Sequence, residues 1–527
     1  MVTDALRDAA ERGKDEAGPD DLRAALGIEV KQPPTAHPTR PYADRLNAEA
    51  LSALQSAIAS AGRRAPVRPE HLRPVLMEVD ATNGAAARTL RSRVSHVVED
   101  SAIGQQLFRV ARAPKLAWNV YIRRSLGHRD YETNPYRIYR WLREREPVRR
   151  DPTAPVWIVT SYEHTLAALR DPRFRKDPFA SERLPRGARE QLGMSESAGA
   201  RSSAENISML FLDPPQHTRV RSIFTRAFTP RTLESLRPRI GQICEEQIAA
   251  MAAHANRPID LIHHLAAPLP VMVIAELLGF PRADYQPLKK WSDDMTEALG
   301  FLPSEEAKLK AAKARDEMRR YFFDSIVPQR RREPNGSLLS GLLEQEARGE
   351  GLDEDELFSN AVLLLAAGHE TTTNLIGNGV LALLEHPDQL RDLREHPDLI
   401  ESAVEELLRF DSPVQWISRV AGEDLELGGK RIKRGDLVLG ALGAANRDPA
   451  VFPNPDRLDI RRKENKHLSL GSGIHFCLGA ALARMEAAIA IGRLLQRFGR
   501  IELGTRKIRW RKGLTFRGMH ELPLALS

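Results

Sequence analysis

The strongest constraint on this chain lies in residues 468–486, LSLGSGIHFCLGAALARME, where a glycine-rich turn carries one cysteine and passes directly into a helix. Glycines let the backbone bend tightly and approach a flat ligand closely. The helix that follows Cys477 directs its positive end and its free N–H groups at the sulfur, which favours the thiolate form that binds metals. The turn therefore predicts a metal-binding thiolate, although a lone cysteine is more often a small core residue.

Only two cysteines, Cys244 and Cys477, occur among the 527 residues. They are too few for an iron–sulfur cluster or a cysteine-rich zinc site, and a single disulfide between them is the remaining pairing. We expect Cys244, which lies in a helical stretch, to be a core residue. The net charge is +7, but acidic residues are nearly as numerous as basic ones and aromatics make up 6%. This balance argues against nucleic-acid binding and favours a basic face that docks a small acidic protein.

The first 112 residues differ in texture from the rest of the chain. Four prolines between residues 33 and 41 are typical of a linker, and short amphipathic stretches follow. We expect residues 1–112 to form a helical or partly disordered extension of unknown role, or alternatively a partner-docking module, and residues 113–527 to form the main domain. No apolar run reaches the roughly 18–20 residues of a membrane span, and no signal segment is evident. A cytoplasmic protein without a membrane anchor is expected.

Beyond residue 112, hydrophobic periodicity predicts a mainly α domain with minor β structure. Long helical stretches are predicted at residues 231–253, 307–326, 353–384, 387–410 and 478–498, with a shorter helix at 270–278 that starts on a proline. Strands are predicted at residues 155–160, 425–432 and 436–442.

Two further groups of residues stand out within the predicted helices. Glu406 and Arg409 lie one turn apart, a spacing that is also common in surface ion pairs. In residues 367–373, AGHETTT, a glycine and three threonines interrupt strong helix-forming sequence. Such a local conflict often marks a kink or a π-bulge at a functional site. The ordinary alternative is that each threonine hydroxyl bonds a carbonyl one turn back.

The cysteine turn resembles the heme-binding signature of the cytochrome P-450 family, Phe-Gly-x-Gly-x-His-x-Cys-x-Gly, with Leu470 in place of the phenylalanine. The resemblance implies that Cys477 is the axial ligand of a heme iron. It also places His475, as a donor to a heme carboxylate, and Gly479 in the heme site. A thiolate ligand pushes electron density onto the iron and favours O–O cleavage. Because Leu470 is also apolar, its presence instead of phenylalanine is expected to affect only the redox potential of the heme.

Other segments resemble the same family in sequence order. Glu406 and Arg409 would form a buried charge network with Arg457 that supports the heme pocket. Glu370 would relay protons through water and Thr371 would hydrogen-bond the bound dioxygen, which is general acid catalysis.

The resemblance also assigns the residues around the heme edge and the substrate. His217 and Arg221, four residues apart on one helix face, and Arg419 would bind heme propionates through charge-assisted pairs. The residues expected to line the substrate pocket are Ala367, Gln415 and Ile417. Residues 178–210 would form a lid, and Arg484 would help to steer a redox partner to the cysteine side of the heme.

The resemblance covers about residues 113–527 and implies the cytochrome P-450 fold of the soluble bacterial members. It implies a monooxygenase that inserts one oxygen atom from O2 into a hydrophobic small molecule. The expected cofactor is heme b, with no flavin or iron–sulfur cluster in this chain, so electrons would come from a separate ferredoxin or flavodoxin with its reductase. The alternatives are a peroxide-driven or isomerising heme-thiolate enzyme, against which Glu370 and Thr371 argue, and a non-enzymatic heme sensor.

Overall fold

The computed structural model describes residues 131–527 except for 132, 152–155, 178–179, 182, 184–207, 227, 254–256, 300–304, 350, 506 and 512. The predicted extension, its boundary at residue 112 and nearly all of the predicted lid lie outside these residues. The described part is mainly helical with small sheets, as predicted. None of its helices is long and apolar enough to cross a membrane.

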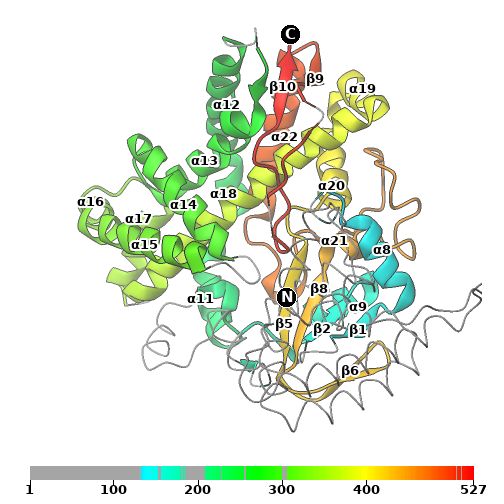
Figure 1. Ribbon diagram of the computed structural model, residues 1–527. Helices are drawn as coiled ribbons and strands as arrows, with labels where there is room; N and C mark the ends of the chain where they lie inside the picture. The colour runs from blue at the N-terminus through cyan, green and yellow to red at the C-terminus, as the bar shows by residue number, and fades with distance from the viewer. Residues whose placement is uncertain are drawn as a thin grey trace, which may run out of the picture. The chain divides into compact units, whose positions relative to one another are not determined.

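The long helix α18 (Glu354–Glu385) runs through the middle of the domain (Figure 1). Asp353 and Glu356 form a capping box at its start, in which each carboxylate accepts the other residue's backbone N–H. Acidic residues fill the first turn, where they match the positive end of the helix dipole. Most of α18 is buried, because α13, α14, α20 and α22 pack around it. A helix buried on nearly all sides can hold functional groups rigidly.

The other helices form most of the remaining domain, and in Figure 1 α12 to α17 lie to one side of α18 while strands β2, β5 and β8 lie to the other. Their bounds are α8 (Tyr136–Arg145), α9 (Tyr162–Arg170), α11 (Gln216–Thr225), α12 (Pro230–Ala252), α13 (Pro268–Leu278), α14 (Tyr285–Leu299), α15 (Glu305–Tyr321), α16 (Val327–Arg332), α17 (Leu338–Ala347), α19 (Pro387–Glu395), α20 (Ile400–Phe410), α21 (Leu442–Ala445) and α22 (Ala480–Arg497). The short helices are η5 (Met209–Phe211), η6 (Ile262–Ala266), η7 (Arg282–Asp284), η8 (Phe322–Ile326), η9 (Pro397–Leu399) and η10 (Gly473–His475).

Among the described residues the main sheet has the strand order β1–β2–β8–β5–β3, in which only the β2–β8 pair is parallel. Its strands are β1 (Val148–Arg150), β2 (Val156–Val159), β3 (Phe174–Arg175), β5 (Trp416–Ala421) and β8 (Leu437–Ala441). Two smaller antiparallel sheets comprise β4 (Ile259–Asp260), β10 (Pro523–Leu526) and β9 (Ile501–Leu503), and β6 (Leu425–Leu427) with β7 (Lys430–Ile432).

The structure corrects three sequence predictions. The stretch predicted as one helix at 387–410 is broken into α19, η9 and α20, because Pro397 cannot continue the preceding helix. The strand predicted at 425–432 is a hairpin, since Gly428 and Gly429 adopt positive φ angles of 59° and 70° between β6 and β7. Of the two features expected at residues 367–373, a kink or a π-bulge, the π-bulge is absent, since α18 is α-helical throughout; among the described residues π-helical turns occur at η6 and η8 instead.

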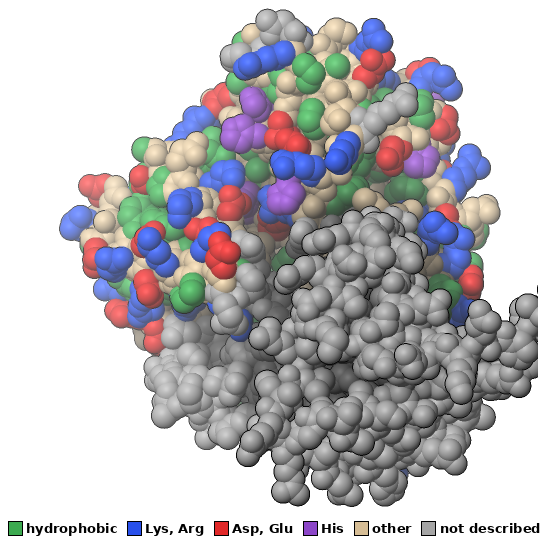
Figure 2. Space-filling model, in the orientation of Figure 1, with side chains coloured by type: hydrophobic (Ala, Val, Ile, Leu, Met, Phe, Trp, Pro, Cys, Tyr) green, Lys and Arg blue, Asp and Glu red, His purple; other side chains and the backbone are tan. Residues whose placement is uncertain are grey.

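The visible described surface carries both signs of charge. On the face shown in Figure 2, Lys and Arg side chains alternate with Asp and Glu over the helices. Charges on the described helices are often paired across adjacent helical turns, for example Lys290 with Asp294 at 2.9 Å. The described part of the face in Figure 2 shows no continuous basic stripe of the kind that nucleic-acid binding needs.

Candidate active site

The cysteine loop is shaped by its glycines and by the helix behind it. Gly471 and Gly473 have φ angles of 73° and 71°, a region that glycine tolerates best. A Cβ on Gly473 would lie 2.8 Å from the Leu169 carbonyl oxygen, so the loop packs too tightly against α9 for a side chain there. The Cys477 N–H donates to the Leu470 carbonyl at 2.9 Å, which fixes the sulfur-bearing residue just before α22.

Competing effects act on the Cys477 thiol. Burial raises its pKa, while a hydrogen bond from the Gly479 N–H and the charges of Arg221 and Arg484 lower it. The net direction is upward in the protein without bound metal, so the expected lowering by the helix is outweighed by burial. Both described cysteines are free, and the alternative of a Cys244–Cys477 disulfide is wrong. Cys244 is fully buried in the main core, as predicted.

Cationic side chains from separate elements converge beside the cysteine loop. We call the following five residues the cationic cluster: Lys176, after β3; His217 and Arg221, on α11; Arg419, on β5; and His475, on η10. Burial lowers the pKa of Lys176 to about 7 and that of Arg419 to about 10, and the carboxylate of Asp213 opposes both shifts. Burial, followed by the other four cations, lowers the pKa of His475 to about 2.

The cationic cluster lacks the anions that it needs. The Nε2 atoms of His217 and His475 are buried without a hydrogen-bond partner, although their rings lie 4.2 Å apart. The Asp213 carboxylate already accepts the N–H groups of Lys176 and Asp177 at 2.8 and 3.1 Å. Buried cations and orphaned ring nitrogens are costly unless an anion completes them. The cluster thus fits the two carboxylates of a heme.

A partly accessible stripe runs along α18. Leu363, Ala367, Gly368 and Thr371 are half-buried and share one helix face, while the residues between them are buried. A Cβ added at Gly479 would meet no atom within 4 Å, so space also remains beside the cysteine loop. The Cys477 sulfur can ligate iron, and the cationic cluster can bind carboxylates. Together with the free space beside the loop, they suit a flat, dianionic iron porphyrin.

Thr371, which belongs to this stripe, and Glu370, which lies next to it, already have protein partners. The Glu370 carboxylate is 3% exposed and pairs with Arg511, whose Nη1 lies 3.0 and 2.9 Å from its two oxygens. The Thr371 hydroxyl donates to the Ala367 carbonyl at 2.7 Å, the ordinary bond of a helical threonine. A hydroxyl that donates in this way still offers lone pairs as acceptors.

A polar group beside Glu370 was missed by the sequence reasoning. His369 is 1% exposed; its Nδ1 lies 2.9 Å from the Ser292 hydroxyl and 3.8 Å from a carboxylate oxygen of Asp293, both on α14. Its Nε2 is buried without a partner. In the sequence, His369 stands out only as part of the segment 367–373. Its partners Ser292 and Asp293 lie far away in the chain, so the sequence gives no sign of them.

The structure corrects one member of the predicted charge network. Arg409 pairs with Glu406 through two bonds of 2.8 Å, and both side chains are fully buried. The second guanidinium is that of Arg462, whose Nε lies 3.0 Å from Glu406, and not that of Arg457. Arg457 is exposed and contributes only its backbone carbonyl, which accepts from Arg409 at 3.1 Å.

Other predicted residues have well-defined surroundings. The Gln415 amide donates to the Ser412 carbonyl at 2.7 Å and to the Tyr136 hydroxyl at 3.3 Å. Ile417 packs on α9 and α21, close to Gly440. Their roles in a substrate pocket stay predictions. Arg484 makes bonds of 2.5 and 2.9 Å to Glu405, so its charge is largely compensated within the protein.

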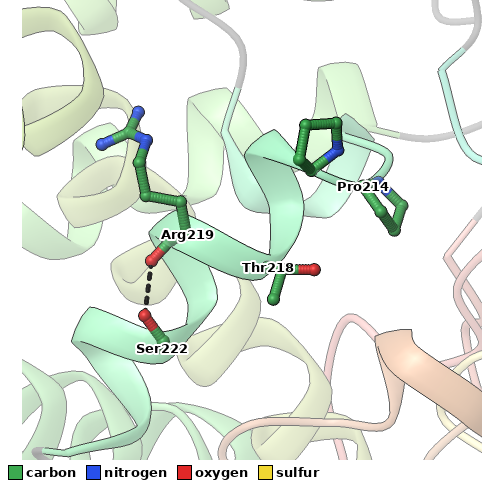
Figure 3. Close-up of a pocket in the computed structure, with 5 residues that line it drawn as sticks. Pro214, Thr218, Arg219 and Ser222 are labelled. Carbon is green, nitrogen blue, oxygen red and sulfur yellow. Dashed lines mark hydrogen bonds between the residues drawn. The ribbon is translucent and has the colours of Figure 1, made fainter.

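A surface pocket lies on a neighbouring face of α11. It is lined by Pro214, Pro215, Thr218, Arg219 and Ser222, and Figure 3 shows the Ser222 hydroxyl donating to the Arg219 carbonyl at 2.7 Å. Adjacent residues on a helix point about 100° apart, so this pocket is separate from the side of α11 that carries His217. It contains none of the predicted heme-binding residues.

Comparisons with known proteins agree with the geometry. The family model for cytochrome P-450 matches residues 155–508. The chain is 40% identical over 406 residues to a biotin biosynthesis cytochrome P-450 of Bacillus subtilis, covering 76% of this chain and 99% of that protein. It is 40% identical over 400 residues to a vitamin D(3) 25-hydroxylase of Pseudonocardia autotrophica, covering 75% of this chain and 94% of that protein.

The fold is shared with solved structures as well. The crystal structure of a cytochrome P-450 in complex with hexadec-9Z-enoic acid ligated acyl carrier protein matches with a TM-score of 0.68 and 39% sequence identity. The match covers 76% of this chain and 100% of that one. Together with the cysteine loop and the cationic cluster, these findings show that the chain belongs to the cytochrome P-450 family of heme-dependent monooxygenases.

Proposed function

We propose that this protein binds heme b through Cys477 and inserts one atom of O2 into a hydrophobic small molecule, with electrons from a separate ferredoxin or flavodoxin and its reductase. The observation that carries the proposal is the cationic cluster beside the cysteine loop, with its two unpartnered histidine nitrogens. When bound, the heme supplies the redox chemistry by which O2, two electrons, two protons and a C–H bond give an alcohol and water.

The residues of this chain would hold that cofactor at both ends. Arg419, His217 and His475 would donate hydrogen bonds to the propionates, since charge-assisted bonds to carboxylates are short and strong. Arg221 joins the two halves of the site, because it donates to the Phe476 carbonyl next to Cys477. Leu470 packs against the main core and keeps the sulfur side apolar.

Proton handling would fall to α18. Glu370 is the buried carboxylate next to the accessible stripe, and Thr371 is the stripe's hydroxyl. In the proposed reaction the Glu370 carboxylate takes up protons from water at the edge of α18. The Thr371 hydroxyl would hydrogen-bond the dioxygen and hold a proton next to it. Positioned acids of this kind contribute about 10²- to 10⁴-fold to a rate.

The substrate class follows from the lining and from the relatives. The accessible stripe on α18 presents Leu363, Ala367 and Gly368 ahead of Thr371, and so offers apolar contacts with one polar end. The matched structure holds an unsaturated fatty acyl chain, and one relative is named for the hydroxylation of vitamin D(3). Long apolar chains and fused rings are therefore the compounds to screen.

The first experiment tests the cofactor. Purified protein is reduced under carbon monoxide and its difference spectrum is recorded, with the pigment extracted to identify the porphyrin. The expected result is the red-shifted band of a thiolate-bound heme, which disappears in Cys477→Ala. A protein that takes up no heme would overturn the proposal.

The second experiment separates the alternatives. Compounds that shift the heme spin state are incubated either with NADPH, a surrogate ferredoxin and its reductase, or with hydrogen peroxide alone. Oxygenated product from the ferredoxin system supports the proposal. Product from peroxide alone would favour the peroxide-driven enzyme, and heme binding without any product from either system would favour a sensor.

A further inference from the structure

A hairpin near residue 515 reaches into the protein beside α18. Trp510 and Met519 form an isolated antiparallel bridge, and the Arg511 N–H donates to the Gly518 carbonyl at 2.9 Å. The Arg511 Nε also lies 3.4 Å from the Met519 carbonyl. The backbone of the hairpin therefore holds the Arg511 side chain in one direction. We refer to Trp510, Arg511 and residues 513–519 as the Arg511 hairpin.

One face of α18 holds this hairpin at three consecutive turns. Glu370 pairs with Arg511, the Asn374 side chain contacts Gly518, and the Asn378 amide donates to the Arg517 carbonyl at 3.0 Å. A Cβ on Gly518 would lie 1.9 Å from the Asn374 side-chain oxygen, so the approach is as close as a glycine allows. Residues four apart share a helix face, and the three side chains thus form one polar stripe.

The Glu370 carboxylate is held by two side chains, those of Arg511 and Asn374. Arg511 Nη1 lies 3.0 and 2.9 Å from its two oxygens, and the Asn374 amide donates to one of them at 3.0 Å. The carboxylate is 3% exposed, whereas the Arg511 side chain is 34% exposed. The ion pair consequently lies where the buried interior beside α18 meets solvent. A carboxylate held in this way cannot rotate without breaking charged hydrogen bonds.

We propose that Arg511 is a positioning residue for proton delivery, which holds the Glu370 carboxylate between solvent and the Thr371 hydroxyl. This inference rests on the proposed function, because it presumes that Glu370 handles protons. Without Arg511 the carboxylate is free to turn toward water, and its distance from Thr371 is no longer fixed. Positioning of this kind is what converts a nearby acid into an efficient one.

The competing explanation is that Arg511 only anchors the hairpin. An anchor would matter for folding and for heme retention, but it would leave the proton-dependent step unchanged. The chain provides a matched control at the base of the hairpin, in the residues that flank it on either side. Arg509 pairs with Glu521 at 2.8 Å, but both side chains lie at the surface, with 64% and 42% exposure. Exposed pairs of this type contribute little.

The experiment compares Arg511→Ala, Arg511→Lys and Arg509→Ala with the wild-type holoprotein, and includes Glu370→Gln as a test of the relay itself. Hexadec-9Z-enoic acid serves as the apolar probe, with NADPH, a surrogate ferredoxin and its reductase. O2 consumption is measured in H2O and in D2O across pH. The C–O stretching band of the reduced, carbon monoxide-bound protein is recorded as a readout that needs no turnover.

The expected result for Arg511→Ala is O2 consumption lowered about tenfold, a larger solvent isotope effect and a shifted or broadened C–O band, since loss of positioning removes part of a general acid's contribution. Arg511→Lys should recover part of the rate because it keeps the charge, and Arg509→Ala should match the wild type. If Arg511→Ala does not load heme, Arg511→Gln takes its place.

Two results would overturn the inference. The first is that Glu370→Gln consumes O2 slowly while Arg511→Ala keeps the wild-type rate and the wild-type solvent isotope effect. The second is an Arg511→Ala variant that loses thermal stability and rate but keeps the wild-type isotope effect and C–O band, which is the behaviour of an anchor. A Glu370→Gln variant with wild-type kinetics would instead reject the proposed proton relay.

Discussion

The buried network around Glu406 gives a quantitative prediction that distinguishes Arg462 from Arg457, which lies five residues earlier in the same loop. Glu406 is fully buried, and the Arg462 side chain, which is 9% exposed, reaches it at 3.0 Å and also donates to the Pro453 carbonyl at 3.0 Å. A hydrogen bond to a charged group contributes about 1.5–3 kcal/mol. Glu406 keeps Arg409 as its partner in the variant, so we expect Arg462→Ala to lower the free energy of unfolding by about 2 kcal/mol.

Two further variants bracket this value. Glu406→Ala leaves the buried Arg409 guanidinium without its counter-charge, which costs about 3–5 kcal/mol. Arg457→Ala removes an exposed side chain whose contribution to the network is only its carbonyl, so the free energy of unfolding should not change. The expected order of stability is therefore wild type and Arg457→Ala, then Arg462→Ala, then Glu406→Ala.

The assay is urea unfolding of the heme-loaded protein, followed by far-ultraviolet circular dichroism and by the heme absorption band. For Arg462→Ala the midpoint should fall by about 0.5 M, if the urea dependence is about 4 kcal/mol/M for a domain of this size. The reasoning is refuted if Arg457→Ala lowers the midpoint as much as Arg462→Ala, or if neither variant changes it.

Three other predictions follow from buried groups. Arg419→Ala should raise the rate of heme transfer to apomyoglobin by about tenfold or more, because a charged hydrogen bond is lost, whereas Arg431→Ala, at an exposed pair with Asp424, should not. Burial raises the pKa of Glu486 to about 8, so the folded protein keeps a proton that the unfolded chain releases above about pH 4.3, and stability falls as pH rises through that window. Glu486→Gln should therefore unfold at a higher temperature than the wild type at pH 8, with the difference shrinking toward pH 5; an equal difference at both would contradict the assignment. Gly518→Ala should cost about 1–3 kcal/mol in thermal unfolding because its Cβ meets the Asn374 side chain, and an unchanged melting temperature would show that the hairpin can move away.

Local signals account for what could be predicted from the sequence. Glycines and a following helix marked the loop of Cys477. Periodicity located α12, α13, α18 and α22 to within two residues at both ends. Glu406 and Arg409 were found because they lie on one helical turn, and the structure confirms their pairing.

Contacts between distant segments account for the rest. The family resemblance placed Arg457 in the network. Residues 446–466 have no periodicity that could show that Arg462 points inward instead, and Asn454 in this loop has a φ of 48°. Lys176 approaches the Ser418 hydroxyl to 3.4 Å across 242 residues of sequence. Arg511 meets Glu370 across 141 residues. Neither residue belongs to a short motif, so only the fold reveals them.

The cationic cluster has a consequence for the life of the protein in a cell. In a chain without heme, the charges of Lys176 and Arg419 repel each other in a buried space, and the same charges keep His475 in its neutral form. A dianionic cofactor removes this repulsion and binds only the folded form, and such a ligand at 100 times its Kd adds about 2.7 kcal/mol to stability. We therefore expect the abundance of this enzyme to follow the supply of heme as well as the rate of its synthesis, because the empty chain unfolds more often and is degraded sooner.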